Sequence, residues 1–252
     1  MTNTLLITGG ASGIGAETAR RAATRGYKIA VNYRSREKEA QAIVADIKAR
    51  GAQAVALQAD MGREADVVRL FADAERALGP ITHLVNSAGI NGRRGRVDNY
   101  DGVALAEVFG VNVIGLMLCC REATKRMSTK HGGKGGAIVN VSSMAGTLGG
   151  RPGSSAYATT KGAVDAFTKG FAREVAAERI RVNSVRPGMV LTEMTEGRLS
   201  DEAFRTSIEA SIPMRRIGKA NEIAETILWL LSDDASFITG AMLDAAGGGY
   251  II

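Results

Sequence analysis

A tyrosine and a lysine four residues apart, Tyr157 and Lys161, lie in the stretch SSAYATTKG at residues 154–162. Residues at this spacing share one face of an α-helix, so the lysine ammonium could lie beside the phenol. A phenol has a pKa of about 10, and a neighbouring positive charge lowers it toward values at which the proton exchanges near neutral pH. The pair predicts a proton-transfer site. The alternative is a helix face of small residues on which both side chains happen to lie.

A glycine-rich loop, TGGASGIG (8–15), lies between the apolar run TLLIT (4–8) and an amphipathic segment at 14–26. Its glycines at 9, 13 and 15 lack a Cβ atom, so backbone amides can approach a pyrophosphate, and the helix N-terminus favours its negative charge. A glycine-rich turn is by itself a weak signal. Because this one lies between a strand and a helix, it predicts a dinucleotide-binding loop.

The second predicted strand indicates which adenosine ribose this loop would accept. An acid at its end would bind free ribose hydroxyls and repel a 2′-phosphate, but Arg34 and Arg36 precede the first acid, Glu37. A guanidinium can bind phosphate through two hydrogen bonds, so NADP(H) is the preferred cofactor and NAD(H) remains possible. The alternative is that both arginines are solvated charges at a helix start. Asp60 is placed to accept from the adenine amino group or to cap the next helix.

Apolar runs alternate with amphipathic segments along the whole chain. The predicted strands are 4–8, 28–33, 53–60, 82–89, 136–143, 180–188 and one within 238–248, and the predicted helices are 14–26, 37–51, 64–79, 101–130, 155–178 and 221–233. This repetition predicts a doubly wound, Rossmann-like α/β fold of about seven parallel strands with helices on both faces. No linker divides the chain, so residues 1–252 are predicted to form a single domain, with a substrate lid around 188–220.

The composition argues against several classes of function. The net charge is +6, but basic residues are scattered among acids and no basic run is interleaved with aromatics, so nucleic acid is not an expected partner. The two cysteines, Cys119 and Cys120, are adjacent, and no His or Cys cluster has the spacing of a metal site. With no signal peptide and no apolar run that approaches a membrane span, the protein is expected to be cytoplasmic and not membrane-bound.

These motifs together resemble those of the short-chain dehydrogenase/reductase family, in its single-domain branch. NSAG (86–89) resembles the family's N-N-A-G, with Ser87 in place of the second asparagine, and VNVIG (111–115) resembles the segment that carries the catalytic asparagine. IVNVSS (138–143) resembles the strand that carries the serine, and RPGMVLTEM (186–194) resembles the proline-glycine loop. The similarity runs nearly end to end and is strongest to bacterial 3-oxoacyl or sugar-type reductases.

The resemblance implies a catalytic set of Asn112, Ser143, Tyr157 and Lys161. Tyr157 would protonate a substrate carbonyl, Ser143 would donate a second hydrogen bond, and Lys161 would lower the phenol pKa and bind the nicotinamide ribose. Asn112 would hold a water that links Lys161 to solvent. Ser142 and Ser143 would point to opposite faces of a continuing strand, so only one can serve, and the family alignment favours Ser143. The residues implied at the cofactor are Gly9, Ser12, Gly13, Ile14, Gly15, Arg34, Asp60, Met61, Asn86, Ala88, Gly89, Tyr157, Lys161, Pro187, Gly188, Val190 and Thr192.

The implied function is an NADP(H)-dependent oxidoreductase that transfers hydride between nicotinamide and a small ketone or secondary alcohol, such as a sugar or 3-oxoacyl compound. The alternative is a non-catalytic NADP(H)-binding sensor, which would be expected to lose the tyrosine or the lysine. Segments 101–130 and 155–178 resemble those that pair subunits in the family, so a homotetramer is expected ahead of a dimer. Four loop arginines are expected to be solvated, and the alternative is that they meet an acidic substrate: Arg93, Arg94, Arg96 and Arg151.

Overall fold

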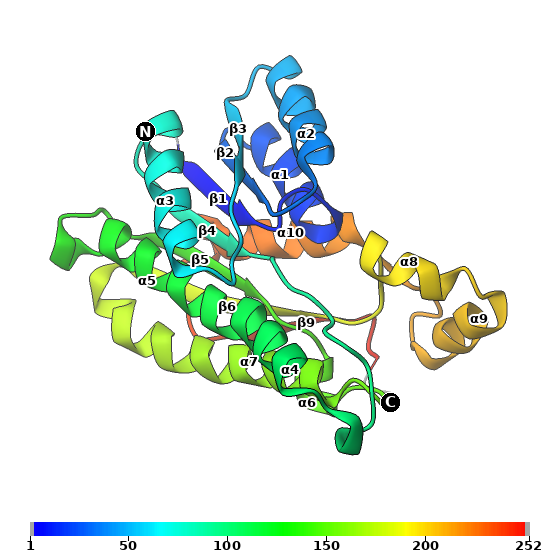
Figure 1. Cartoon of the computed structure of the whole chain (residues 1–252). Helices are drawn as coiled ribbons and strands as arrows, with labels where there is room; N and C mark the ends of the chain where they lie inside the picture. Colours follow the sequence, from blue (N-terminus) through cyan, green and yellow to red (C-terminus); the bar gives the residue numbers. More distant parts are fainter. Residues whose placement is uncertain (1–2, 250–252) are drawn as a thin grey trace.

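The central sheet of the computed structural model has seven parallel strands in the order β3-β2-β1-β4-β5-β6-β9 (Figure 1). The structure describes residues 3–249, so both ends of the predicted domain, 1–2 and 250–252, lie outside it. The strands are β1 (Thr4–Thr8), β2 (Lys28–Tyr33), β3 (Ala54–Gln58), β4 (His83–Asn86), β5 (Gly136–Val141), β6 (Ile180–Pro187) and β9 (Met242–Ala245). The predicted doubly wound fold is confirmed. The strand order reverses between β1 and β4, which creates a crevice at their carboxyl ends.

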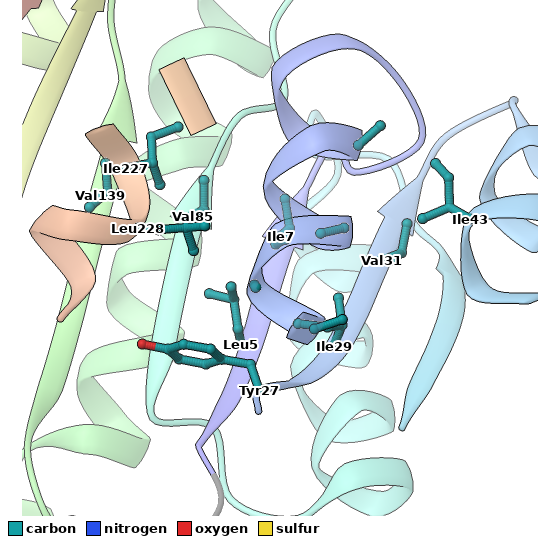
Figure 2. Close-up of a cluster of buried hydrophobic side chains, with 14 of the residues drawn as sticks. Leu5, Ile7, Tyr27, Ile29, Val31, Ile43, Val85, Val139, Ile227 and Leu228 are labelled. Atoms are coloured by element: carbon teal, nitrogen blue, oxygen red, sulfur yellow. The ribbon is translucent and has the colours of Figure 1, made fainter. Parts of the chain in front are cut away.

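Two different sets of helices cover the faces of the sheet. One set is α1 (Gly13–Thr24), α2 (Glu37–Ala49) and α10 (Ala220–Leu231), and the other is α3 (Glu64–Leu78), α5 (Leu116–Met127) and α7 (Ser155–Val175). Successive strand residues point to opposite faces, so Leu5 and Ile7 pack with the first set (Figure 2) and Leu6 packs with the second. The central strands are therefore buried on both sides, and the loops at their ends are left to carry polar chemistry.

The helix expected over 101–130 is interrupted. A π-helical segment, Gly110–Gly115, joins α4 (Gly102–Phe109) to α5, and nothing in the sequence analysis predicted it. A Cβ atom at Gly115 would lie 2.2 Å from the Met61 carbonyl oxygen, so glycine permits this segment to cross close to the chain that follows β3. Single π-helical turns inside α-helices are frequent at functional sites, and this one carries Asn112.

The same helical tract is rich in apolar residues. Gly102–Met127 is long and apolar enough to cross a membrane by length and composition alone, so the expectation that no apolar run approaches that length is wrong. One side of the tract lies in the core, where Leu116 and Cys120 are buried. The other side leaves Val103 and Ile114 exposed. A helix in the core of a folded domain can pass the same test of length and composition. Here, packing against the sheet accounts for the apolar residues on the buried side of the tract only.

Residues 188–220, the predicted lid, form two helices that project from one end of the sheet (Figure 1). The helices are α8 (Glu193–Leu199) and α9 (Glu202–Ser211), and the short strands β7 (Val190–Leu191) and β8 (Gly218–Lys219) pair at their base. Four apolar side chains give this segment a small core of its own: Leu199, Ile208, Ile212 and Ile217. The paired strands hold the two ends of the segment together. Whether the helices open and close as a lid stays a prediction.

Candidate active site

The phenol of Tyr157 and the ammonium of Lys161 lie close together at the start of α7. Lys161 Nζ is 5.7 Å from the centroid of the Tyr157 ring and donates a hydrogen bond to the carbonyl oxygen of Val141, the last residue of β5, at 2.8 Å. Because α7 begins at Ser155, both residues lie in its first two turns, directly above the end of a central strand. The shared helix face expected from the four-residue spacing is therefore present.

The two adjacent serines after β5 have different surroundings. Ser142 is buried, and its hydroxyl donates to the Lys161 carbonyl oxygen at 3.1 Å. Ser143 lines the same cavity as Tyr157 and shares a hydrogen bond with its phenol. Successive residues of extended backbone point in opposite directions, which separates the two hydroxyls. Ser143 is the serine that faces the phenol.

Burial dominates the proton affinities of this pair. Removal from water raises the pKa of Tyr157 above its usual value, and the hydrogen bond with Ser143 offsets only part of that rise. Burial also lowers the pKa of Lys161 from 10.5 to about 8, against the opposing effect of the Asp165 charge. The expected lowering of the phenol pKa by Lys161 is not seen: burial is the largest effect on the phenol, and Lys161 Nζ is directed at the Val141 carbonyl. Near pH 7 the phenol keeps its proton and the amine keeps its charge.

Asp165 lies one turn beyond Lys161 on α7 and connects this helix to β6. Its Oδ1 accepts a hydrogen bond from the Ser184 hydroxyl of β6 at 3.1 Å, and its Oδ2 lies 3.7 Å from the Arg186 guanidinium. The sequence analysis did not single out this residue. The interval from Tyr157 to Lys161 repeats from Lys161 to Asp165, and this repetition was the signal that could have identified it.

The side-chain amide of Asn112 forms three hydrogen bonds within the protein. Its Oδ1 accepts from the Ile90 backbone N–H at 2.8 Å, and its Nδ2 donates to the Ile90 carbonyl at 2.9 Å and to the Thr160 hydroxyl at 3.1 Å. The side chain thus ties the loop after β4 to α7, next to Lys161. In this structure it is a positioning residue, and the expected role in holding a water stays a prediction.

A cleft at the carboxyl ends of β1 to β4 is lined by seven of the residues expected at the cofactor: Gly9, Ser12, Arg34, Asp60, Met61, Ala88 and Gly89. Gly9 has φ 64°, and a Cβ atom there would lie 2.8 Å from Ala88 Cα, so glycine is needed where the two loops meet. Asn32, which the sequence analysis missed, accepts from the Gly9 N–H at 3.1 Å and donates to the Ala59 carbonyl at 3.1 Å. The narrow turn at the N-terminus of α1 fits the pyrophosphate of a dinucleotide.

Asp60 and Asn86 form side-chain contacts within the protein. Asp60 Oδ1 accepts from the Gly62 N–H at 2.9 Å, and the N-cap of α3 is Arg63, so the alternative role of Asp60 as a helix cap is wrong. Asn86 is only 2% exposed and donates to Asn140 Oδ1 at 2.9 Å across the β4–β5 pair. It ties two strands together beneath the cleft, and its contact with a cofactor stays a prediction.

The other residues expected at the cofactor lie outside the lining of this cleft. Ile14 and Gly15 lie in the first turn of α1, and Gly13 and Thr192 line a neighbouring hollow. Thr192 is also the N-cap of α8, where its backbone N–H donates to the Thr195 hydroxyl. Val190 is buried in β7. Among residues 3–249, no group of three or more His, Cys, Asp or Glu side chains could hold a metal ion.

A second cavity, of about 230 Å³, opens on the other side of the phenol. Ser143 and Tyr157 lie in its wall together with Pro187, Gly188 and residues of α8 and α9. The loop after β4 borders both hollows, because Gly89 lines the cleft and Asn91 lines the cavity. A dinucleotide in the cleft and a small molecule in the cavity would therefore meet beside Tyr157.

A doubly wound sheet with a cleft at its strand ends and a Ser-Tyr-Lys group beside that cleft defines an NAD(P)-dependent oxidoreductase that acts on carbonyl or CH–OH groups. A family model described as enoyl-(acyl carrier protein) reductase matches residues 9–250. With this match and the relatives below, the chain belongs to the short-chain dehydrogenase/reductase family.

Relatives of this chain match it over nearly their whole length. The uncharacterised oxidoreductase YgfF of Escherichia coli (strain K12) is 47% identical over 245 residues, which cover 96% of this chain and 98% of that protein. The 3-oxoacyl-[acyl-carrier-protein] reductase FabG of Staphylococcus aureus (strain Mu50 / ATCC 700699) is 36% identical and covers 100% of this chain and 99% of its own. A solved short-chain dehydrogenase from Burkholderia cenocepacia J2315 in complex with NADP superimposes with a TM-score of 0.89 at 31% identity, and covers 99% of this chain and 98% of its own.

The buried amine predicts a specific dependence of stability on pH. The folded-state pKa of Lys161, about 8, lies below the unfolded value of 10.5, so between these values the unfolded chain binds more protons. Burial of the charge therefore destabilises the protein below about pH 8, and this penalty disappears as the pH rises to about 10.5, a change worth about 3 kcal/mol.

Urea unfolding of the wild type and of Lys161→Met at pH 7.5, 9 and 10 (roughly spanning that window) measures this effect. The difference in unfolding free energy between the two proteins should favour Lys161→Met at the lowest pH and shrink as the pH rises. Other groups that titrate in this range are common to both proteins and cancel. A difference that does not change with pH would contradict the assigned pKa of Lys161.

Proposed function

We propose that this protein reduces a small ketone with NADPH, and oxidises the corresponding secondary alcohol in reverse, with Tyr157 as the general acid. The observation that carries the proposal is the position of the Tyr157 phenol, beside Ser143 in the wall of a cavity that adjoins the cleft proposed to bind a dinucleotide. The substrate class that we propose is a 3-oxoacyl or sugar-type ketone, and the name of the FabG relative supports the 3-oxoacyl class.

Each residue of the site has its own role in the proposed reaction. The nicotinamide cofactor, when bound, supplies hydride to the carbonyl carbon. Ser143 and Tyr157 donate hydrogen bonds to the carbonyl oxygen, where negative charge grows, and Tyr157 then transfers its proton to that oxygen. Lys161 Nζ, 5.7 Å from the centre of the Tyr157 ring, is placed to bind ribose hydroxyls. Asn112 holds the loop after β4 and α7 at a constant spacing around this group.

The preference for NADP(H) rests on the charges around the cleft. Arg34 and Arg36 both line it, they are exposed, and Asp60 is the one acidic side chain among the described lining residues. An adenosine 2′-phosphate would therefore meet two cations and no acid at the end of β2. Related structures from Burkholderia cenocepacia and from a metagenomic library were solved with NADP and NADPH respectively.

The alternative is a sensor that binds NADP(H) without turnover. A sensor has no need for a proton donor, and this chain keeps the phenol, the serine and the buried amine together at the cavity. Consumption of NADPH with a panel of ketones separates the two functions, because a sensor would bind NADPH and oxidise none of it.

A cytoplasmic homotetramer is the form we propose for the protein. One group of exposed apolar side chains lies on the α4–α5 tract, and includes Ile114 at 56% exposure. A second lies on or after α10, and includes Phe237 at 102% exposure. Exposed apolar groups of this kind mark interfaces, and two different self-complementary interfaces on one chain generate a tetramer with three two-fold axes.

Replacement of the phenol tests the reaction. Tyr157→Phe should lower kcat for ketone reduction by about 10²- to 10⁴-fold, the range of general acid catalysis, and leave the Kd for NADPH within about threefold. Stopped-flow absorbance at the NADPH band and fluorescence titration measure the two quantities. Tyr27→Phe is the matched control, because Tyr27 stacks edge-on against His83 inside the core. A Tyr157→Phe enzyme as fast as the wild type would refute the proposed function.

The coenzyme preference is tested by reversing one charge. Arg34→Asp should raise the KM for NADPH at least tenfold and change the KM for NADH much less, because an aspartate repels the 2′-phosphate and can bind ribose hydroxyls. Arg50→Asp is the control for net charge, because Arg50 follows α2 and pairs with Asp46 away from the cleft. Equal changes for both coenzymes would show that Arg34 does not meet the phosphate.

Light scattering after size exclusion tests the assembly. The wild type should have about four times the mass of one chain, whereas Ile114→Glu and Phe237→Glu should each yield dimers, because each charge disrupts one interface and leaves the other. A wild-type mass of one chain contradicts the proposal, and tetramers in both variants would place the interfaces elsewhere.

A further inference from the structure

The charged side chains in the wall of the cavity beside Tyr157 are all positive among the described residues. Three arginines lie in it, and they come from three separate segments: Arg94 follows β4, Arg151 precedes α7, and Arg198 lies on α8. No aspartate or glutamate is among the described residues that line the cavity. Arg94 is exposed, as expected of a solvated loop charge, but it also lines this cavity together with the half-buried Arg151 and with Arg198, which the sequence did not single out.

These arginines differ from their neighbours in their partners. Arg96, two residues beyond Arg94, pairs with Asp98, and Arg205 pairs with Glu209 on the outside of α9. No ion pair links Arg94, Arg151 or Arg198 to any acidic side chain within residues 3–249. The three cations that face the cavity are therefore among those that form no ion pair with a carboxylate in the described part of the chain.

A single aromatic ring holds two of these cations together. The guanidinium carbon of Arg198 lies 4.7 Å from the centroid of Phe204, and that of Arg151 lies 5.3 Å from it. Cation–π attraction offsets part of the repulsion between like charges. Burial first, and then the charges of Arg94 and Arg151, lower the pKa of Arg198. A bound anion would relieve that repulsion.

The cavity also offers a polar atom with no partner. Ser154, at the start of α7, lines the cavity, and its hydroxyl oxygen is buried with no hydrogen-bond partner in the described part of the chain. A buried hydroxyl without a partner is uncommon in folded proteins.

We propose that the substrate is an anionic ketone, whose carbonyl meets Tyr157 and Ser143 and whose carboxylate or phosphate is bound by Arg94, Arg151 and Arg198. This inference rests on the proposed ketone reduction and names its substrate class. The apolar side chains of Met144, Leu148 and Ile212 in the same wall suit the carbon atoms between the two ends. Each cation comes from a different segment, so the anion would also hold α8 and α9 against the body of the protein.

The test uses pairs of ketones that differ in charge. Acetoacetate is compared with its methyl ester, and dihydroxyacetone phosphate with dihydroxyacetone, each with saturating NADPH. The charged member of at least one pair should have a kcat/KM at least tenfold higher, because hydrogen bonds between charged groups are the strong ones. The pair that shows the difference identifies carboxylate or phosphate as the recognised group.

Variants connect the preference to the arginines. Arg198→Gln and Arg151→Gln should each raise KM for the charged ketone at least tenfold, with little change in kcat and little change for its neutral partner, whose turnover also reports correct folding. Arg96→Gln is the matched control from the same loop as Arg94, and it should leave both substrates unchanged. Equal kcat/KM for charged and neutral ketones, or equal losses for both in the variants, would overturn the inference.

Calorimetric titration of each anionic ketone into the NADP⁺-loaded protein separates this inference from the proposed function. Binding that Arg198→Gln abolishes, without NADPH oxidation by any ketone, would refute the reductase and keep the anion site. Turnover of neutral ketones without binding of either anion would do the reverse.

Discussion

The site depends on one buried charge. Lys161 Nζ lies 5.7 Å from the centre of the Tyr157 ring, donates to the end of β5 and is so deeply enclosed that burial lowers its pKa to about 8. A buried ammonium is costly unless its surroundings compensate it, so the elements around it must keep their positions. Ser142 accordingly holds the Lys161 carbonyl, and Asp165 lies one turn below. These contacts position α7 over the strand end, and this position brings Tyr157 beside Ser143.

The parallel sheet provides the place where this can happen. Each loop at the carboxyl edge of the sheet follows a strand. Because the order of the strands reverses between β1 and β4, these loops form two separate hollows. The cleft is lined by the loops after β1 to β4, and the cavity by the segments after β4, β5, β6 and β9 together with α8 and α9. The loop after β4 takes part in both, and Asn112 holds it to α7. A cofactor and a substrate can thus be bound by different halves of the sheet and still meet at one residue.

The electrostatic character of the two hollows differs from that of the molecule as a whole. Many charges on the helices pair with a residue three or four positions away, and exposed pairs of this kind add little to stability. The cations at the end of β2 and around the cavity lack such pairs, and they lie where phosphate and carboxylate groups would enter. The net charge of +6 is therefore less informative than the location of the unpaired cations.

The sequence by itself determined most of the strands and helices, the glycine loop and the pair of Tyr157 and Lys161, because these depend on local periodicity, on loop chemistry and on spacing along one helix. Only the tertiary structure decided which serine faces the phenol, that Asn86 lies beneath the cleft, that a π-helical segment carries Asn112, and that Arg94, Arg151 and Arg198 share one cavity. It also reversed the expected effect on the phenol, since desolvation acts through all neighbouring atoms and not through one helical neighbour. The physical reason is the same in each case: burial and contacts between distant segments arise only when the sheet brings strand ends together, and no local pattern records them.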